Sequence, residues 1–220
     1  MRDDITSIPI SEVFEPKDGC PVCRLRDMLE ERSVTYITGA AMMEPDVRIE
    51  TNRQGFCRFH YGEMLKRGKK LTVALIIQSH LAQIAKDGIS PLGKKETLRE
   101  SCFICNKLER NMRQIVQNVC LLWDKENEFR NLYSDQPYIC LNHCKMLLGA
   151  ADRVGKASRR EFLKVTKQLA QKQMTELAGD LQHFCDMFDY HNSENNDWGN
   201  SKDSVERTVE YLTTRKLPSR

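Results

Sequence analysis

Four short pairs of metal-binding residue types, each pair with two residues between its members, recur along this 220-residue chain. They are Cys20 with Cys23, Cys57 with His60, Cys102 with Cys105, and Cys140 with His143. The two Cys-x-x-Cys pairs lie 82 residues apart, and the two Cys-x-x-His pairs lie 83 residues apart. A single inserted residue therefore relates two copies of a unit of about 80 residues, which indicates an internal duplication.

The spacing within each pair is typical of metal ligands. Residues at positions i and i+3 lie on the same side of a helical turn, so two such pairs can surround one ion. Three cysteines and one histidine form a usual ligand set for structural zinc. Pairing within each repeat predicts two Zn²⁺ sites per chain, one from Cys20, Cys23, Cys57 and His60, and the other from Cys102, Cys105, Cys140 and His143.

Two alternatives to this zinc assignment stay open. An iron–sulfur cluster uses the same soft thiolate ligands, although its usual set is four cysteines. Cys144 follows His143 directly and competes with it as the fourth ligand of the second site. Neither Cys-x-x-Cys is followed by the glycine of a zinc-ribbon knuckle, so the pattern does not favour a ribbon.

The predicted sites are closed. Four protein ligands leave no coordination position for water or substrate, which catalysis by zinc requires. No Gly-rich phosphate loop, nucleophile elbow or His-Glu-x-x-His occurs. Near the C-terminus, helical spacing turns His183 away from Cys185 and Asp189, so these residues do not form a catalytic group. We predict no catalytic residue and favour a protein that is not an enzyme.

The rest of the chain predicts an all-α fold. We expect two helical repeats, residues 1–93 and 94–191, followed by a polar loop and a C-terminal helix over 192–220 that packs on the body. The apolar stretch 71–86 predicts a buried central helix, and 103–133 predicts one long helix. We interpret 43–46 and 51–55 as turns, and residues 43–52, "MEPDVRIETN", as a charged loop suited to a polar ligand.

Other helical signals lie in the second half of the chain. Ser158 and Glu161 form a predicted capping box, and Trp198 is expected to dock the C-terminal loop on the body. Cys120 and Cys185 lie in apolar helical settings and are interpreted as core thiols, and His80 as a hydrogen-bonded core histidine.

Composition limits the classes of partner and the compartment. The chain has nine cysteines, an odd number, and its N-terminus lacks the pattern of a signal peptide. Together these features favour thiol or metal chemistry over disulfides and a cytoplasmic location. No apolar run approaches the roughly 20 residues that span a bilayer. A formal charge of +3 argues against nucleic acid as the partner, and clusters such as Arg159 with Arg160 are interpreted as solvated surface.

The chain also resembles an uncharacterised family of bacterial proteins over nearly its whole length. The resemblance rests on the ordered stretches "SIPISEVFE", "CPVC", "MMEPDVRIETNRQGFCRFHY", "ALIIQSHL", "CFIC", "CLNHC", "FDYHN" and "DW". The family carries the same paired Cys-x-x-Cys and Cys-x-x-His motifs. The resemblance supports the eight predicted metal ligands and implies no particular reaction.

These observations lead to three hypotheses. The first is a zinc-stabilised helical scaffold or adaptor that binds a protein partner. The second is a redox sensor or enzyme in which an iron–sulfur cluster or a Cys-x-x-Cys pair reacts. The third is nucleic-acid binding through residues 66–70 and 153–160.

Overall fold

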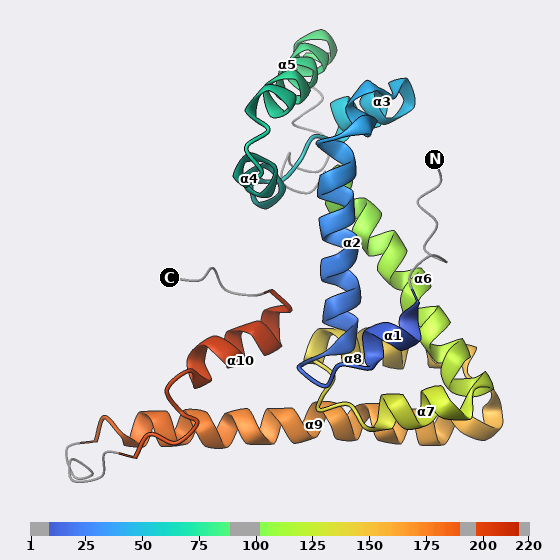
Figure 1. Cartoon of the computed structure of the whole chain (residues 1–220), viewed down its shortest axis with the longest axis vertical. Coiled ribbons are helices and arrows are strands. Elements are labelled where there is room, and N and C mark those ends of the chain that lie inside the picture. The colour runs from blue at the N-terminus through green and yellow to red at the C-terminus, as the bar shows by residue number, and fades with distance from the viewer. Residues whose placement is uncertain (1–8, 89–101, 190–196, 216–220) are drawn as a thin grey trace. The chain divides into compact units, whose positions relative to one another are not determined.

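The computed structural model describes residues 9–88, 102–189 and 197–215. Within these ranges the chain forms helices and no strand, which confirms the all-α prediction (Figure 1). In chain order the elements are α1 (Ile10–Phe14), α2 (Pro21–Ile37), the 3₁₀ turn η2 (Ala40–Met43), α3 (Pro45–Gln54), α4 (Arg58–Lys66), α5 (Lys70–Asp87), α6 (Phe103–Lys125), α7 (Asn127–Ser134), α8 (Leu141–Gly149), the 3₁₀ turn η4 (Ala151–Arg153), α9 (Lys156–Asp186) and α10 (Ser204–Thr213).

The chain divides into two compact units. Unit 1 comprises Met1–Leu25 and Arg113–Arg220, and unit 2 comprises Arg26–Met112. These units do not follow the sequence repeats at 1–93 and 94–191, because α2 begins in unit 1 and α6 begins in unit 2. Each long helix therefore carries the chain from one unit into the other.

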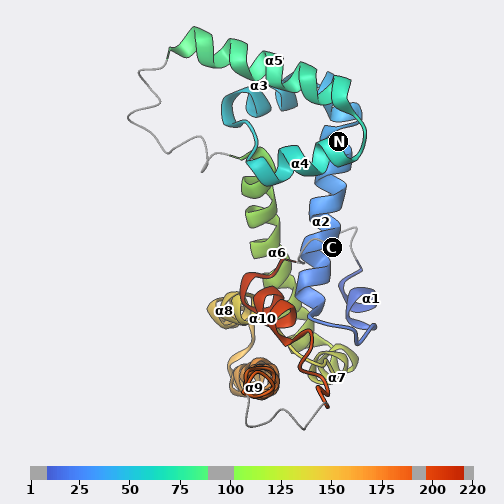
Figure 2. The same cartoon turned by 90° about the vertical axis from the view of Figure 1, so that its left-hand side faces the viewer.

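Unit 2 is built around a small apolar core to which α2, α3, α4, α5 and the start of α6 contribute. Its buried members are Val34, Ile37, Ala41, Phe56, Met64, Val73, Ile76, Cys102 and Ile104. Figure 2 shows α5 running across α3 and α4, and α3 and α4 are its main packing partners. On α5 only Val73, Ile76 and His80 are buried, so the prediction of a buried central helix is wrong.

Residues 45–54 form α3, and the interpretation of this stretch as turns and a charged loop is also wrong. Pro45 occupies the first turn of α3, where proline sacrifices no hydrogen bond. Gly55 ends the helix with a φ of 65°, a conformation that suits glycine. Pro45 and Gly55 therefore mark the two ends of a helix and not breaks between helices.

Unit 1 has an aromatic core. Phe14, Trp123, Phe129, Tyr133 and Phe162 are almost completely buried and pack ring against ring. The Tyr133 hydroxyl forms a 2.8 Å hydrogen bond with the hydroxyl of Thr166 in α9. These contacts join α1, α6, α7 and α9 around one centre.

The long helix predicted over 103–133 is interrupted. Glu126 adopts an extended conformation between α6 and α7. The guanidinium group of Arg130 in α7 donates to the carbonyl of Trp123 at 3.2–3.3 Å, so a carbonyl at the end of α6 gains a partner. Arg130 therefore stabilises the end of α6.

The C-terminal part of unit 1 is organised by α9. It begins after Gly155 with no side-chain cap, so the predicted capping box of Ser158 and Glu161 is wrong. The helix α10 packs on α9 and α8, and its Tyr211 hydroxyl donates to the Ala170 carbonyl at 2.8 Å. Trp198 packs against Phe184 and Phe188 of the region around the end of α9, as predicted.

In the part of the chain that the structure describes, no helix combines the length and the apolar character needed to cross a membrane.

Candidate metal centres

Each of the four ligand pairs begins a helix. Cys57 is the N-cap residue of α4 and Cys140 that of α8, both with extended backbone, and Cys20 and Cys102 directly precede α2 and α6. The carbonyl of each first cysteine accepts a hydrogen bond from the amide four residues later. The second ligand of each pair therefore lies in the first helical turn. The positive end of the helix dipole favours thiolates at this position.

The eight side chains meet in two groups, within each of which all ligand atoms lie within 4.8 Å of one another. Group 1, in unit 1, comprises Cys20, Cys23, Cys140 and His143, and group 2, in unit 2, comprises Cys57, His60, Cys102 and Cys105. Each group has three cysteines and one histidine. The predicted pairing within each repeat is wrong, because each group combines the Cys-x-x-Cys of one repeat with the Cys-x-x-His of the other.

The lengths of α2 and α6 explain why each group combines residues of both repeats. The 17 residues of α2 carry the chain about 25 Å away from Cys20, and the 23 residues of α6 carry it about 34 Å away from Cys102. After α2 the chain folds locally, with α3 packed on η2 and α5, and does not return to Cys20. The Cys-x-x-His pair that follows each long helix therefore meets the other repeat's Cys-x-x-Cys pair.

The distances in both groups fit a tetrahedral ion. The Nδ1 atom of His143 lies 3.1–3.8 Å from the three sulfurs of group 1. The Nδ1 atom of His60 lies 3.2–3.4 Å from the three sulfurs of group 2. For zinc bound tetrahedrally at usual bond lengths, sulfur–nitrogen separations are about 3.5 Å and sulfur–sulfur separations about 3.8 Å. The sulfur pairs Cys23–Cys140 and Cys57–Cys105 are 3.6 and 3.8 Å apart, so both groups could hold a metal ion.

A carboxylate orients the histidine of group 2. The Nε2 atom of His60 lies 3.0 Å from a carboxylate oxygen of Glu30, and the His60 side chain is fully buried. If Nε2 carries the proton that it donates to Glu30, Nδ1 keeps its lone pair for an ion, the arrangement that supports many metal-binding histidines. Arg26 lies 3.4 Å from the same carboxylate. Glu30 could not be predicted from the sequence, because nothing in the spacing relates it to a ligand 30 residues away.

The ionisation of group 2 reflects these contacts. The hydrogen bond with Cys105 lowers the pKa of the Cys102 thiol to about 3, although burial opposes this change. Burial also works against protonation of His60, but hydrogen bonds with Cys102 and Glu30 raise the pKa of His60 to about 10. The pKa of Cys105 is raised by the neighbouring Cys102 thiolate. In the absence of an ion, a protonated His60 therefore stabilises the Cys102 thiolate.

Group 1 shows the same competition between its thiols. Burial disfavours the Cys20 thiolate, yet hydrogen bonds with Cys140 and Cys23 bring the pKa of Cys20 well below its usual value. The hydrogen bond with Cys20 raises the pKa of Cys140 to about 12. Several thiols packed this closely cannot all lose their protons unless a cation compensates their charge.

The remaining cysteines lie outside both groups, and the described cysteines are all free thiols. Cys144 belongs to neither group, and its thiol donates to the carbonyl of Thr166 at 3.9 Å. His143, and not Cys144, therefore lies with the other three side chains of group 1. Cys120 is buried as predicted, whereas Cys185 is exposed, so its interpretation as a core thiol is wrong.

Other residues singled out by sequence have structural contacts. His80 is buried and its Nδ1–H donates to the Asn52 carbonyl at 2.6 Å, as expected for a core histidine. Glu44 accepts a 2.8 Å hydrogen bond from the Tyr36 hydroxyl. His183 lies 2.9 Å, through Nε2, from the Asp197 carbonyl. His191, a second histidine near the C-terminus, lies outside the described residues.

Fold and site together define an all-helical protein with two Cys₃His groups, each able to hold a metal ion. Two stretches of the chain, residues 1–98 and 88–219, match the family described as a family of unknown function, DUF6062. The chain belongs to this family, and the double match agrees with the internal duplication. No curated protein and no solved structure matches the chain.

Proposed function

We propose that this protein is a helical scaffold that two structural zinc ions stabilise and that binds a protein partner through one face of α5. The ligand groups are the main support for zinc. Each offers three sulfurs and one imidazole nitrogen at tetrahedral separations, a set more usual for zinc than for an iron–sulfur cluster. With four protein ligands around it, the ion braces helix starts and has no position for a substrate.

Metal analysis with paired cysteine variants tests this proposal and the exchanged pairing together. The intact chain should hold two equivalents of zinc and remain colourless. Cys23→Ser with Cys140→Ser alters group 1 alone and should remove one equivalent, whereas Cys23→Ser with Cys57→Ser should remove both. The reverse pattern would restore the pairing within repeats, and a brown protein with acid-labile sulfide would refute zinc.

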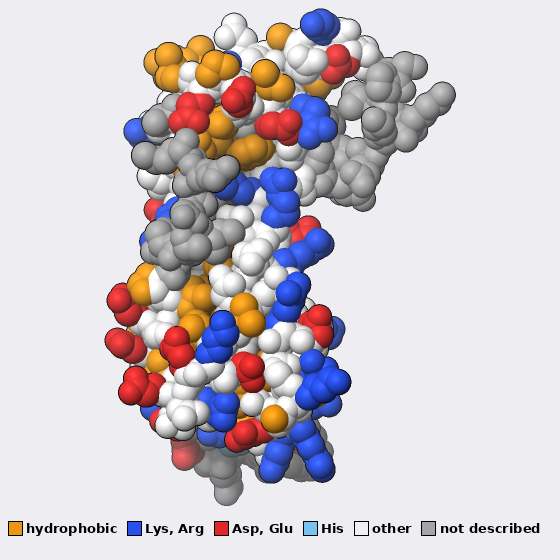
Figure 3. Space-filling view, turned by 90° about the vertical axis from the view of Figure 1, so that its right-hand side faces the viewer, with side chains coloured by type: hydrophobic (Ala, Val, Ile, Leu, Met, Phe, Trp, Pro, Cys, Tyr) orange, Lys and Arg blue, Asp and Glu red, His pale blue; other side chains and the backbone are white. Residues whose placement is uncertain are grey.

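The exposed face of α5 supports the role in binding. Seven of its exposed positions, Leu71, Ala74, Leu75, Gln78, Leu81, Ala82 and Ala85, fall within a stripe about 120° wide on a regular helix, and the exposed charged residues Lys70, Lys86 and Asp87 at the two ends of α5 lie outside it. Leu71, Leu75 and Leu81 are 74%, 38% and 58% exposed. The stripe contains no charge, and hydrophobic side chains are also visible on the surface of unit 2 in Figure 3, in its upper part. An uncharged stripe of this kind fits another helix.

The pattern of the stripe favours a second copy of the chain as the partner. The seven positions are symmetric about Gln78, at three, four and seven residues to either side. Two antiparallel copies of α5 with Gln78 at the twofold axis would place Leu75 level with Leu81, and Leu71 level with Ala85. Ala74 would lie level with Ala82, so the two stripes would match position by position, as in a self-complementary twofold interface. The stripe is only about 21 Å long, so we expect a weak dimer.

Sedimentation equilibrium of charge variants tests this arrangement. The mass of the intact chain should rise from 25.5 kDa towards twice that value with concentration. Leu75→Lys alone and Leu81→Glu alone should abolish the rise, because each places an unpaired charge in the interface. The double variant should restore it, since the two new charges meet across an antiparallel pair. Met174→Lys, at an exposed position of unit 1, is the control. A monomer at every concentration would refute self-association.

A further inference from the structure

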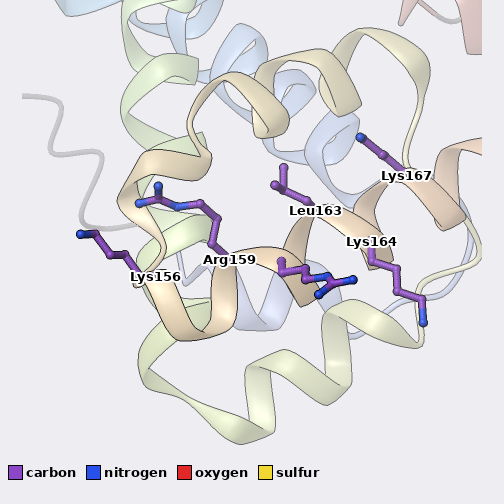
Figure 4. A pocket seen from close by; sticks show the side chains of 6 residues that line it. Lys156, Arg159, Leu163, Lys164 and Lys167 are labelled. Atoms are coloured by element: carbon purple, nitrogen blue, oxygen red, sulfur yellow. The ribbon is translucent and has the colours of Figure 1, made fainter.

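A row of positive side chains follows the first three turns of α9 in unit 1. Lys156, Arg159, Arg160, Lys164 and Lys167 surround Leu163 and line a hollow of about 460 Å³. Figure 4 shows these side chains projecting from the start of α9. On a regular helix they span about 140° of its circumference. We call these five residues the α9 basic row.

The α9 basic row lacks ion-pair partners in the described part of the chain, although the Asp124 carboxylate lies close to Gly155, the residue before the helix. Among the described residues no carboxylate forms an ion pair with any of its five members, although Arg159 donates to the carbonyls of Asp152 and Val154. Elsewhere in the described chain seven basic residues are paired with acids: Lys17, Arg24, Arg26, Arg53, Lys66, Arg67 and Arg207. Other basic residues of the described chain, such as Lys69 and Lys70, form no ion pair either, and α9 differs from them because five such residues share one face of one helix.

The helix itself disfavours this arrangement. The first turn of α9 contains no acidic residue, although the positive end of the helix dipole favours acids there and disfavours Lys156. Lys156, Arg160 and Lys164 follow one another at intervals of four residues, where like charges repel. A local arrangement that opposes folding is expected where it serves binding. The absent counter-charge points to an anion from outside the chain.

We propose that the α9 basic row binds the phosphate backbone of a nucleic acid. Five positive charges lie along about 16 Å of helix, with a mean rise of about 4.1 Å from one to the next, comparable with the 3.4 Å between charges along one strand of DNA. An extended acidic peptide offers a carboxylate on one face only about every 6.7 Å. The row contains no aromatic side chain for base stacking, so the phosphates and not the bases are its expected contacts. Leu163 is the one apolar residue that lines the hollow, too little for insertion into a lipid surface.

The α9 basic row is separate from the metal groups and from the α5 stripe, since it lies in unit 1 on a helix that holds neither group's ligands. The formal charge of +3 on the whole chain argued against nucleic acid as the partner, but this total does not reflect the five positive charges gathered on one helix. Local charge, and not the total, determines phosphate contacts.

Fluorescence anisotropy of the metal-loaded full chain with a labelled 20-base-pair duplex of mixed sequence tests the proposal. With five phosphate contacts, the logarithm of the binding constant should fall with that of salt concentration at a slope of about −4.5, which is about a 500-fold loss between 50 and 200 mM. The variant Lys156→Gln, Arg160→Gln, Lys164→Gln should bind more weakly, with a slope of about −1.8.

A control variant separates the row from general charge. Lys69→Gln, Lys70→Gln, Lys86→Gln removes the same charge from exposed positions of unit 2 and should leave the slope unchanged. The proposal is overturned if both triple variants lose affinity equally, or if the intact chain does not bind the duplex at 50 mM salt. Binding to vesicles containing phosphatidylserine in the absence of duplex binding would also overturn it and would indicate a membrane surface instead.

Discussion

Glu30 provides the most direct test of how the protein supports a metal ion in group 2. Its carboxylate lies 3.0 Å from Nε2 of His60, and both side chains are largely shielded from water. Replacing such a carboxylate typically weakens metal binding about 10- to 100-fold, or by about 1.4–2.7 kcal/mol. Glu30→Gln keeps an oxygen that can accept a hydrogen bond from His60 but loses the charge, so we expect metal binding about 10-fold weaker. Glu30→Leu loses both the hydrogen bond and the charge, so we expect metal binding about 100-fold weaker.

Cobalt(II) titration with a competing chelator measures this effect through the thiolate-to-metal absorption. A Cys23→Ser background removes a ligand of group 1, so that the signal reports group 2. Glu31→Gln is the matched control, because it makes the same charge change one residue away at an exposed side chain that pairs with Arg67. Equal affinities for the Glu30 and Glu31 variants would refute the view that the carboxylate supports His60 as a ligand.

Two further predictions concern the surroundings of the groups. Gly55→Ala should destabilise the metal-loaded chain by about 2–5 kcal/mol in urea unfolding, because φ is 65° and the new Cβ would lie 2.6 Å from Nε2 of His80. Gly62→Ala is the control: a Cβ there meets nothing within 4 Å, so this variant should be slightly more stable. Equal effects of the two substitutions on the free energy of unfolding would contradict this reasoning. Cys185 should react with a thiol reagent in the native chain, whereas Cys120, with a pKa raised by burial to about 12, should react only after unfolding. Mass mapping of the labelled peptides measures this, and labelling of Cys120 before Cys185 would contradict the prediction.

The comparison of prediction and structure separates short-range from long-range information. The helix starts at the ligand pairs were predictable because they depend on local features, such as Pro21 after Cys20 and the i, i+3 spacing. The errors at α3 and α5 have a different cause. Pro45 and Gly55 suit the ends of a helix as well as a turn, and the apolar face of α5 does not reveal by itself whether this chain or another molecule covers it.

The sequence by itself determined the chemistry of the two groups: eight residues that could bind a metal ion, the composition of three cysteines and one histidine, and the helices that these residues begin. Only the tertiary structure decided which pairs meet and that Glu30 lies beside His60. The reason is the length of α2 and α6, since a rigid helix of about 25 Å or more separates the residues at its ends however close they are in a repeat. The duplication thus provides two equivalent repeats, and because of helix length each group combines the Cys-x-x-Cys pair of one repeat with the Cys-x-x-His pair of the other.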